Sequence, residues 1–124
     1  MIVRDQSQAK TVDWGNGLSH RYLLEADKMG FTVCHTTVRP GTKSRLQYRR
    51  HLEACLCIRG TGRVVTADGQ EYELTPGVIY ALDVHDAHFL IADPDSELEL
   101  ISVFNPPLIG DEVHSLDSDG YSQY

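Results

Sequence analysis

The stretch GTKSRLQYRRHLEACLCIRG, residues 41–60, decides the fold that we expect for this chain. It begins at a Pro40-Gly41 turn and ends at the glycines of RGTGR, so turn residues mark both of its ends. From Glu53 to Arg59, apolar residues alternate with the others in the two-residue period of a β-strand with two distinct faces. Glu53 opens this run, where a carboxylate is either solvated at a strand end or held inward by a partner. The environment of Glu53 therefore decides what this strand does.

Similar short runs follow one another along the chain, separated by turn signals such as Asp68-Gly69 and Pro76-Gly77. No helical stripe longer than about two turns is present, which favours an all-β barrel or sandwich with few short helical turns. Ile2–Arg4 is compatible with a short edge strand, and Thr11–Gly17 is expected to be a loop. The strands predicted are Arg21–Ala26, Phe31–Arg39, Lys43–Tyr48, Glu53–Arg59, Arg63–Thr66, Glu71–Leu74, Val78–Leu82, His88–Ala92 and Glu97–Phe104.

Length and charge limit the classes of protein to consider. A chain of 124 residues is expected to form one domain, spanning 1–124. With 18 acidic against 11 basic residues and no basic cluster larger than Arg49-Arg50, we expect neither nucleic acid nor a membrane as partner. The first ten residues lack a signal-peptide core, so a cytoplasmic location is expected. The polar segment 112–124 is predicted to be a flexible tail or a lid that folds over a bound ligand.

The three cysteines are predicted to be reduced, buried thiols. Cys34, Cys55 and Cys57 are an odd number, and the last two would lie on one strand face, too extended to form a disulfide easily. A single C-x-C pair is only weak evidence for a metal site, because no second pair supports it.

Two windows of the chain resemble the sequence motifs of the cupin superfamily, small jelly-roll barrels that often hold one metal ion. The first window, Gly41–Gly60, has Glu53 at the motif's glutamate position, with Gln47 and Arg49 where the motif has histidines. The second window, Gly77–His88, has the motif's spacing from glycine to histidine. The resemblance implies a single-domain cupin barrel.

A narrower resemblance covers nearly the whole chain in consistent order. The segments that are similar to ectoine synthases are MIVRD at 1–5, HLEA at 51–54, PGVIYALDVHDAH at 76–88, VFNPPLIG at 103–110 and EVH at 112–114. The family closes N-γ-acetyl-L-2,4-diaminobutyrate to the cyclic amidine ectoine with loss of water. The resemblance therefore implies a carbon–oxygen lyase connected with osmotic stress, and it also implies a homodimer.

The resemblance implies a metal site built from Glu53, Tyr80 and His88. Such a mixed oxygen and nitrogen donor set suits a divalent first-row metal, and Fe(II) is expected. His85, in the same HDAH turn, is the rival ligand. The structural alternative is a strand-end glutamate, a core tyrosine and a core histidine whose hydrogen bonds are satisfied.

Further residues are assigned to the substrate. The planar fork of Arg21 is expected to bind the substrate carboxylate. The other candidates are Tyr48, Glu112 and His114 for proton transfer, and Cys34, Thr36, Ser102 and Phe104 for the wall of the substrate pocket.

The chain departs from the family pattern at Gly17, Cys34 and Ser102, where the family commonly has Trp, a polar Asn or His, and Cys. All three positions are associated with the substrate cavity in the family. Two other functions therefore stay open: a metal-dependent cupin dioxygenase or isomerase that acts on another small molecule, and a non-catalytic cupin that binds a solute.

Overall fold

The computed structural model describes residues 1–117 and 120–124. It consists of β-strands joined by turns and two short 3₁₀ turns, so the prediction of an all-β fold is confirmed. The elements are η1 (Gln6–Gln8), β1 (Lys10–Asp13), β2 (Leu18–Leu23), η2 (Glu25–Asp27), β3 (Thr32–Val38), β4 (Lys43–Leu46), β5 (Leu52–Arg59), β6 (Gly62–Thr66), β7 (Glu71–Leu74), β8 (Ile79–Leu82), β9 (His88–Ala92) and β10 (Leu98–Asn105). In this described part of the chain, no helix has the length and apolar character needed to cross a membrane.

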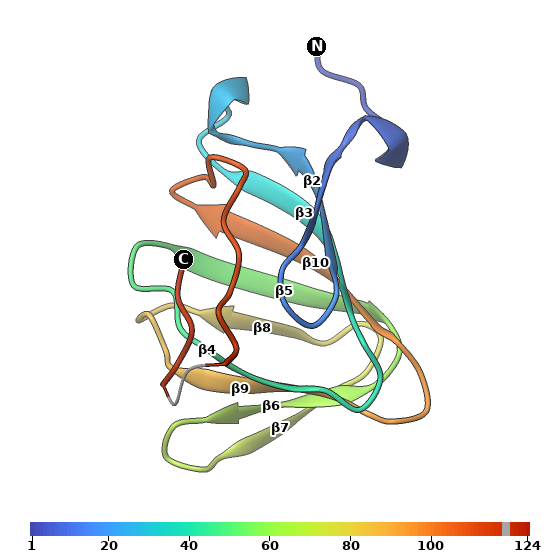
Figure 1. Cartoon of the computed structure of the whole chain (residues 1–124), viewed down its shortest axis with the longest axis vertical. Helices are drawn as coiled ribbons and strands as arrows, with labels where there is room; N and C mark the ends of the chain where they lie inside the picture. Colours follow the sequence, from blue (N-terminus) through green and yellow to red (C-terminus); the bar gives the residue numbers. More distant parts are fainter. Residues whose placement is uncertain (118–119) are drawn as a thin grey trace.

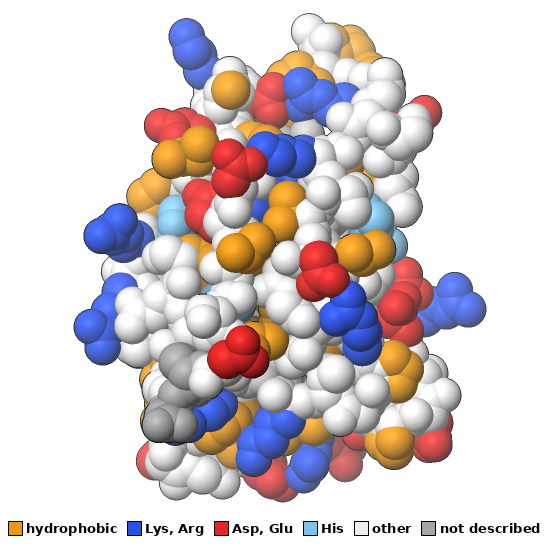
Figure 2. Space-filling view, viewed as in Figure 1, with side chains coloured by type: hydrophobic (Ala, Val, Ile, Leu, Met, Phe, Trp, Pro, Cys, Tyr) orange, Lys and Arg blue, Asp and Glu red, His pale blue; other side chains and the backbone are white. Residues whose placement is uncertain are grey.

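The strands form two antiparallel sheets that face each other (Figure 1). The larger sheet has six strands in the order β1-β2-β3-β10-β5-β8, and the smaller has four in the order β4-β9-β6-β7. Apolar side chains from both sheets, including Leu46, Leu90, Leu98 and Leu100, pack between them. On the face seen in Figure 2, basic and acidic side chains are interspersed over the surface.

Two sequence predictions near the N-terminus are wrong. Lys10–Asp13, expected to lie partly in a loop, forms β1 because it pairs with Leu18–Arg21 of the next strand. Ile2–Arg4 does not form an edge strand; the segment is instead attached through the Arg4 guanidinium, which binds the Asp27 carboxylate through two hydrogen bonds of 2.8 Å. These pairings join segments whose own sequence signals are weak, so only the assembled barrel decides them.

The inner face of β5 carries its polar residues, and the outer face carries its larger aliphatic residues. Glu53, Cys55 and Cys57 are buried, whereas Leu56 and Ile58 are 38% and 44% exposed. The free, buried state of all three cysteines confirms that prediction. The usual sorting of apolar residues to the inside is therefore reversed on β5, which indicates that its inner face serves more than packing.

A single cross-strand row runs over the inner face of the larger sheet. The strand registers pair Arg21 with Cys34, Cys34 with Ser102, Ser102 with Cys55, and Cys55 with Tyr80. Directly paired residues on one face of a sheet lie within contact distance of each other. Four residues that the sequence assigned to a site thus lie side by side, although they come from four different strands.

The segment after β10 runs along the open side of the barrel to β4 and then turns back (Figure 1). The backbone N–H of His114 donates to the carbonyl oxygen of Trp14 at 3.0 Å. Farther along, Ser122 forms a parallel bridge with Leu46 of β4. Within the predicted tail or lid, Ser118 and Asp119 lie outside the described residues, and the role of a lid stays a prediction.

Gly17 allows β2 and β3 to approach each other closely at the start of β2. A Cβ atom at this position would lie 1.9 Å from the carbonyl oxygen of Thr37 and 3.1 Å from the indole nitrogen of Trp14. The indole N–H of Trp14 donates to the same carbonyl oxygen at 2.9 Å. The ring of Trp14 therefore lies directly beside Gly17, where a side chain would crowd it.

We predict that Gly17→Ala destabilises the protein by about 2 kcal/mol or more, because a backbone oxygen must shift to admit the methyl group. Gly120→Ala is the matched control, since the described residues, apart from its chain neighbours, place no atom within 4 Å of a Cβ built there. Urea unfolding of both variants measures the difference. Equal stabilities of the two variants would contradict the close approach at Gly17.

Candidate metal centre and active-site cavity

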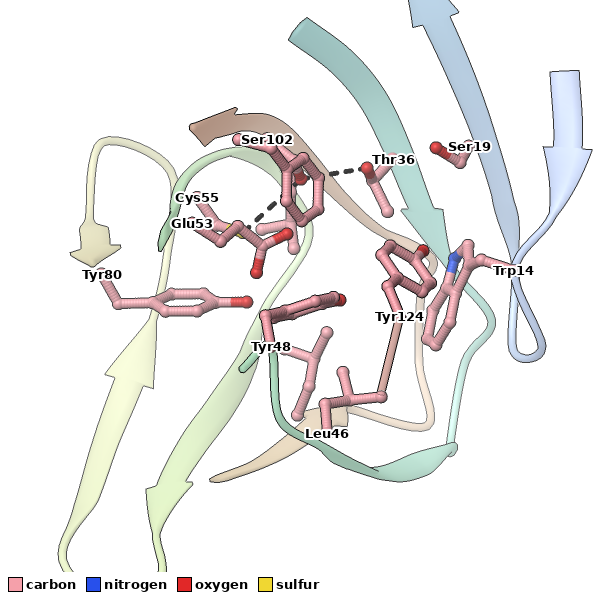
Figure 3. Close-up of a pocket in the computed structure, with 13 residues that line it drawn as sticks. Trp14, Ser19, Thr36, Leu46, Tyr48, Glu53, Cys55, Tyr80, Ser102 and Tyr124 are labelled. Carbon is pink, nitrogen blue, oxygen red and sulfur yellow. Dashed lines mark hydrogen bonds between the residues drawn. The ribbon is translucent and has the colours of Figure 1, made fainter. Parts of the chain in front are cut away.

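A small cavity lies between the two sheets and is closed on one side by the C-terminal segment (Figure 3). Its volume is about 20 Å³, which is room for about one water molecule. Six residues that the sequence assigned to the site line this cavity: Thr36, Tyr48, Glu53, Tyr80, Ser102 and Phe104.

Glu53 projects into the cavity from the beginning of β5 and is 7% exposed. Burial raises the pKa of its carboxyl group to about 8, against a smaller opposite effect of the neighbouring Cys55 thiol. None of the ion pairs formed by the described residues includes Glu53. A buried carboxylate without a cationic partner either keeps its proton or binds a cation.

His88, the first residue of β9, is 1% exposed and has one ring nitrogen without a hydrogen-bond partner among residues 1–117 and 120–124. Its Nδ1 lies 2.9 Å from the carbonyl oxygen of Asp86, so Nδ1 carries the proton and donates it. The lone pair of the neutral ring is then on Nε2, the buried atom without a partner. A histidine fixed in this way by a backbone carbonyl is typical of a metal ligand.

Tyr80 on β8 supplies the third candidate donor. Its hydroxyl group and the carboxylate of Glu53 point to the same part of the cavity (Figure 3), and its ring centroid lies 6.2 Å from that of His88. Burial raises the pKa of Tyr80, so the phenol is protonated unless a cation favours the phenolate. In the described ranges 1–117 and 120–124, no cluster of three His, Cys, Asp or Glu side chains suits a metal ion, so this candidate set depends on a tyrosine.

Tyr48 and His114, both predicted to transfer protons, are in direct contact. The Nε2 atom of His114 lies 2.9 Å from the hydroxyl oxygen of Tyr48. Burial lowers the pKa of His114 to about 3, so its imidazole is neutral near pH 7. Tyr48 lines the cavity, and His114 reaches it through Tyr48.

Arg21 and Glu112 lie together outside the cavity wall. The guanidinium of Arg21 donates to the carbonyl oxygens of Gly110 at 2.7 Å and Glu112 at 2.6 Å. Burial acts to raise the pKa of the Glu112 carboxyl, but amide hydrogen bonds from Gly110 and Ile109, with the charge of Arg21, outweigh it and lower that pKa. In this conformation, both residues hold the segment between β10 and His114 in place.

Of the four predicted wall residues on β3 and β10, Thr36, Ser102 and Phe104 line the cavity, whereas Cys34 does not. The hydroxyl groups of Thr36 and Ser102 are 3.0 Å apart and both residues line it (Figure 3). Cys34 is completely buried between Arg21 and Ser102, outside the cavity lining. Burial also raises the pKa of the Cys34 thiol to about 11, so this thiol is protonated.

Seven lining residues were not among the predicted site residues: Trp14, Ser19, Leu46, Cys55, Leu90, Leu100 and Tyr124. The alternation along β5 places Cys55 on the same face as Glu53, which is a signal that the sequence did contain. Tyr124 had no such signal, because the polar tail gives no indication of where it folds. The ring of Tyr124 stacks on that of His114 with 4.2 Å between the ring centroids, and the Tyr124 hydroxyl oxygen accepts a hydrogen bond of 3.3 Å from Arg21.

Tyr124 also separates the cavity from the surface. It lines both the inner cavity and an outer pocket of about 350 Å³ that is bordered by His51 and Glu112.

His85, the rival ligand, lies in an exposed turn with a left-handed backbone (φ 58°), and its Nδ1 bonds the carbonyl oxygen of Tyr48 at 2.8 Å. His85 therefore lies outside the cavity lining.

The two antiparallel sheets of the barrel give the chain the fold of the cupin class. A sugar phosphate isomerase of the cupin superfamily from Silicibacter pomeroyi superposes with a TM-score of 0.68 at 18% identity, over 84% of this chain and 75% of that one. A likeness at this identity concerns the fold alone.

Matches with higher sequence identity identify the family. The sequence model of the family described as ectoine synthase matches residues 1–123. The L-ectoine synthase of Bordetella avium is 47% identical over 120 residues, which cover 96% of this chain and 86% of that protein. The crystal structure of the ectoine synthase from P. lautus superposes with a TM-score of 0.83 at 38% identity, over 89% of this chain and 81% of that one.

The chain belongs to the ectoine synthase family. It is an enzyme of the carbon–oxygen lyase class, as the sequence predicted, with the function of an ectoine synthase or a close homologue.

The raised pKa of Glu53 predicts that the metal-free protein loses stability as the pH rises. In the unfolded chain this carboxyl group ionises near its ordinary pKa of 4.5, whereas in the folded protein it holds its proton until about pH 8. Between these values the unfolded state binds fewer protons and is favoured by increasing pH. We expect the urea-measured free energy of unfolding to fall from about pH 5 to about pH 8 in the wild type, and less in Glu53→Gln. Parallel pH curves for the two proteins would contradict this assignment.

Proposed function

We propose that the chain catalyses the metal-assisted cyclising dehydration of N-γ-acetyl-L-2,4-diaminobutyrate to ectoine. The observation that carries the metal site is a pair of buried groups in the described residues: the Glu53 carboxyl, which has no ion-pair partner there, and the Nε2 atom of His88, which has no hydrogen-bond partner there. Glu53 and Tyr80 line the cavity, whereas His88 lies behind this lining, with its ring centroid 6.2 Å from that of Tyr80. The assignment of the substrate is supported by the L-ectoine synthases that match nearly the whole chain.

The three donors fit a divalent first-row metal ion, which we propose to be Fe(II). Two oxygen donors and one imidazole nitrogen suit such an ion better than Ca²⁺ or Mg²⁺, which prefer oxygen alone. A bound cation would also favour the ionised forms of Glu53 and Tyr80, whose pKa values burial raises. When bound, the metal supplies a Lewis acid that polarises the acetyl carbonyl group of the substrate.

The residues around the cavity contribute orientation and proton transfer. The α-amine must lie against the acetyl carbonyl carbon, and fixed orientation of this kind contributes up to about 7–11 kcal/mol in the best intramolecular cases. Water leaves with the electron pair of the broken C–O bond and with two protons that both come from the substrate's α-ammonium group. Tyr48, hydrogen-bonded to His114, is the proposed carrier of a proton to the leaving oxygen.

A substrate of this size needs more room than the cavity of about 20 Å³ has. The ring of Tyr124 fills the space between this cavity and the outer pocket, so we propose that the substrate enters from the outer pocket when Tyr124 moves aside. The hydroxyl group of Tyr124 now accepts a hydrogen bond from Arg21. Its displacement would free a donor of Arg21 for the substrate carboxylate, which is how the proposed carboxylate role of Arg21 can coexist with its two backbone carbonyl partners.

The decisive experiment measures turnover of N-γ-acetyl-L-2,4-diaminobutyrate by metal-stripped protein, with and without added Fe(II), followed by chromatography for ectoine. Iron-dependent ectoine is the expected result. Glu53→Ala and His88→Ala should lose bound iron and at least about 100-fold in kcat while they stay folded. Iron content is measured separately by elemental analysis.

His85→Ala is the matched control for metal content, since it removes a histidine of the same turn that is not a lining residue of the cavity and whose ring bonds the backbone carbonyl oxygens of Tyr48 and His51. Full iron occupancy in both Glu53→Ala and His88→Ala would contradict the proposed metal site. Loss of iron in His85→Ala alone would instead identify His85 as a metal ligand. A folded, iron-loaded protein that makes no ectoine would overturn the substrate, and oxygen uptake with other substrates would then indicate a dioxygenase.

We further propose that the chain is a cytoplasmic homodimer. Its three unpaired thiols suit a reducing compartment. The outer face of the larger sheet exposes Leu56 and Ile58 of β5, Ile79 of β8 and Val103 of β10, and the strand registers place Leu56 beside Ile79. A continuous apolar face of this kind is typical of an interface between subunits.

Light scattering coupled to size-exclusion chromatography tests the homodimer. We expect a mass of two chains for the wild type and of one chain for Leu56→Lys, because a charge in the centre of the apolar face opposes its burial. Tyr72→Lys, at an exposed position of the smaller sheet, is the control and should keep the dimer mass. A monomeric wild type would overturn the proposal.

A further inference from the structure

Ser122 lies behind His114 in a buried chain of hydrogen bonds that ends at the cavity. The backbone N–H of Ser115 donates to the Ser122 hydroxyl oxygen at 2.8 Å, which lies 2.8 Å from Nδ1 of His114. The Nε2 atom of His114 then lies 2.9 Å from the hydroxyl oxygen of Tyr48. Tyr48, His114 and Ser122 are each less than a tenth exposed, at 4%, 6% and 6%.

The direction of these hydrogen bonds follows from the hydroxyl group of Ser122. A serine hydroxyl has one proton to donate, and its oxygen already accepts the N–H of Ser115. Among the residues that the structure describes, Nδ1 of His114 is its other partner. Because a buried hydroxyl group that donates to nothing is costly, its proton is directed at Nδ1.

This direction selects one tautomer of His114. With Nδ1 as acceptor, the single proton of the neutral ring is on Nε2, and Nε2–H donates to the oxygen of Tyr48. The proton of Tyr48 is then left without an acceptor among residues 1–117 and 120–124, and Tyr48 lines the cavity. The phenol is therefore free to donate to a group bound there.

The backbone fixes this geometry from the edge of the smaller sheet. The N–H of Ser122 donates to the carbonyl oxygen of Arg45 at 2.7 Å, and its carbonyl oxygen accepts the N–H of Gln47 at 2.8 Å. These bonds attach Ser122 to the strand that leads directly to Tyr48. The stacked ring of Tyr124 holds the plane of the His114 imidazole, at an interplanar angle of 25°.

We propose that Ser122 is a positioning residue that holds His114 in the Nε2–H tautomer and so aims the phenolic proton of Tyr48 into the cavity. This inference rests on the proposed function for its catalytic meaning. As the C–O bond breaks, the O–H proton of Tyr48 passes to the departing oxygen, which leaves as water with the bonding electron pair. The phenolate, stabilised by Nε2–H of His114, regains a proton released by the α-ammonium group of the substrate.

The first test reads the tautomer directly in the wild-type full chain. Long-range ¹H–¹⁵N correlation spectra of ¹⁵N-labelled protein without added metal separate a protonated ring nitrogen from a bare one. We expect His114 to have a bare Nδ1 and a protonated Nε2. A protonated Nδ1 in the wild type would overturn the proposal without recourse to any variant.

Variants then test whether the hydroxyl group of Ser122 determines the tautomer of His114. Ser122→Ala should give a mixture of His114 tautomers, and Ser122→Thr, which keeps a hydroxyl group, should restore the wild-type spectrum. Ser44→Ala is the matched control, because it removes another buried serine hydroxyl group. This hydroxyl accepts a hydrogen bond of 2.7 Å from the side-chain amide of Asn16, and Ser44 is not a lining residue of the cavity. An unchanged tautomer in folded Ser122→Ala would overturn the role of Ser122.

Kinetics connect the tautomer with the reaction. General acid–base catalysis contributes about 100-fold to 10,000-fold, so loss of its alignment in Ser122→Ala should lower kcat on the order of 10-fold and change KM little. Ser122→Thr should recover most of kcat, and Ser44→Ala should match the wild type. An unchanged kcat in Ser122→Ala would overturn the proposal that the orientation of His114 by Ser122 matters for catalysis. A wild type that makes no ectoine, but has the expected tautomer, overturns the proposed function and leaves the orientation of His114 supported.

Discussion

The burial of one carboxyl group without a counter-charge is the constraint on which the site depends. Glu53 lies near the start of β5, between β10 and β8 in the larger sheet, and points inward, where the pKa of its carboxyl group rises to about 8. A protein keeps such a group inside only when the fold holds it firmly, because an uncompensated charge in an apolar interior is costly. The inner face of β5 is accordingly polar, and its aliphatic residues are turned outward, where they are available for a second subunit. The candidate metal site and the apolar outer face are thus two consequences of the same strand orientation.

The C-terminal segment completes what the two sheets begin. The barrel alone supplies Glu53, Tyr80 and Tyr48, whereas His114, Ser122 and Tyr124 arrive from the segment after β10. This segment is held by Arg21 at one end and by the edge of β4 at the other. The arrangement connects access to the cavity with proton transfer in it, because the same few residues close the cavity and orient the ring of His114.

Much of the fold could be predicted from the sequence, because strand periodicity and turn residues are local signals. The strands from β5 to β10 lie within a residue or so of the predicted ranges. Tyr48, Glu53, Tyr80, Thr36, Ser102 and Phe104 were predicted as site residues and do line one cavity. Arg21 was assigned to the substrate, yet its guanidinium binds backbone carbonyl oxygens here, and no local signal could have indicated those partners.

The sequence by itself determined the all-β class and membership in a family recognised by its motifs. It also determined which residues of β5 share a face, because side chains alternate along a strand. Only the tertiary structure decided which face of β5 is inside, since alternation defines two faces but not the direction of the core. It also decided the partners of Trp14, Ser122 and Tyr124, which are contacts between distant parts of the chain. Such contacts depend on how closely the strands approach each other, as at Gly17, and that approach is a property of the packed barrel.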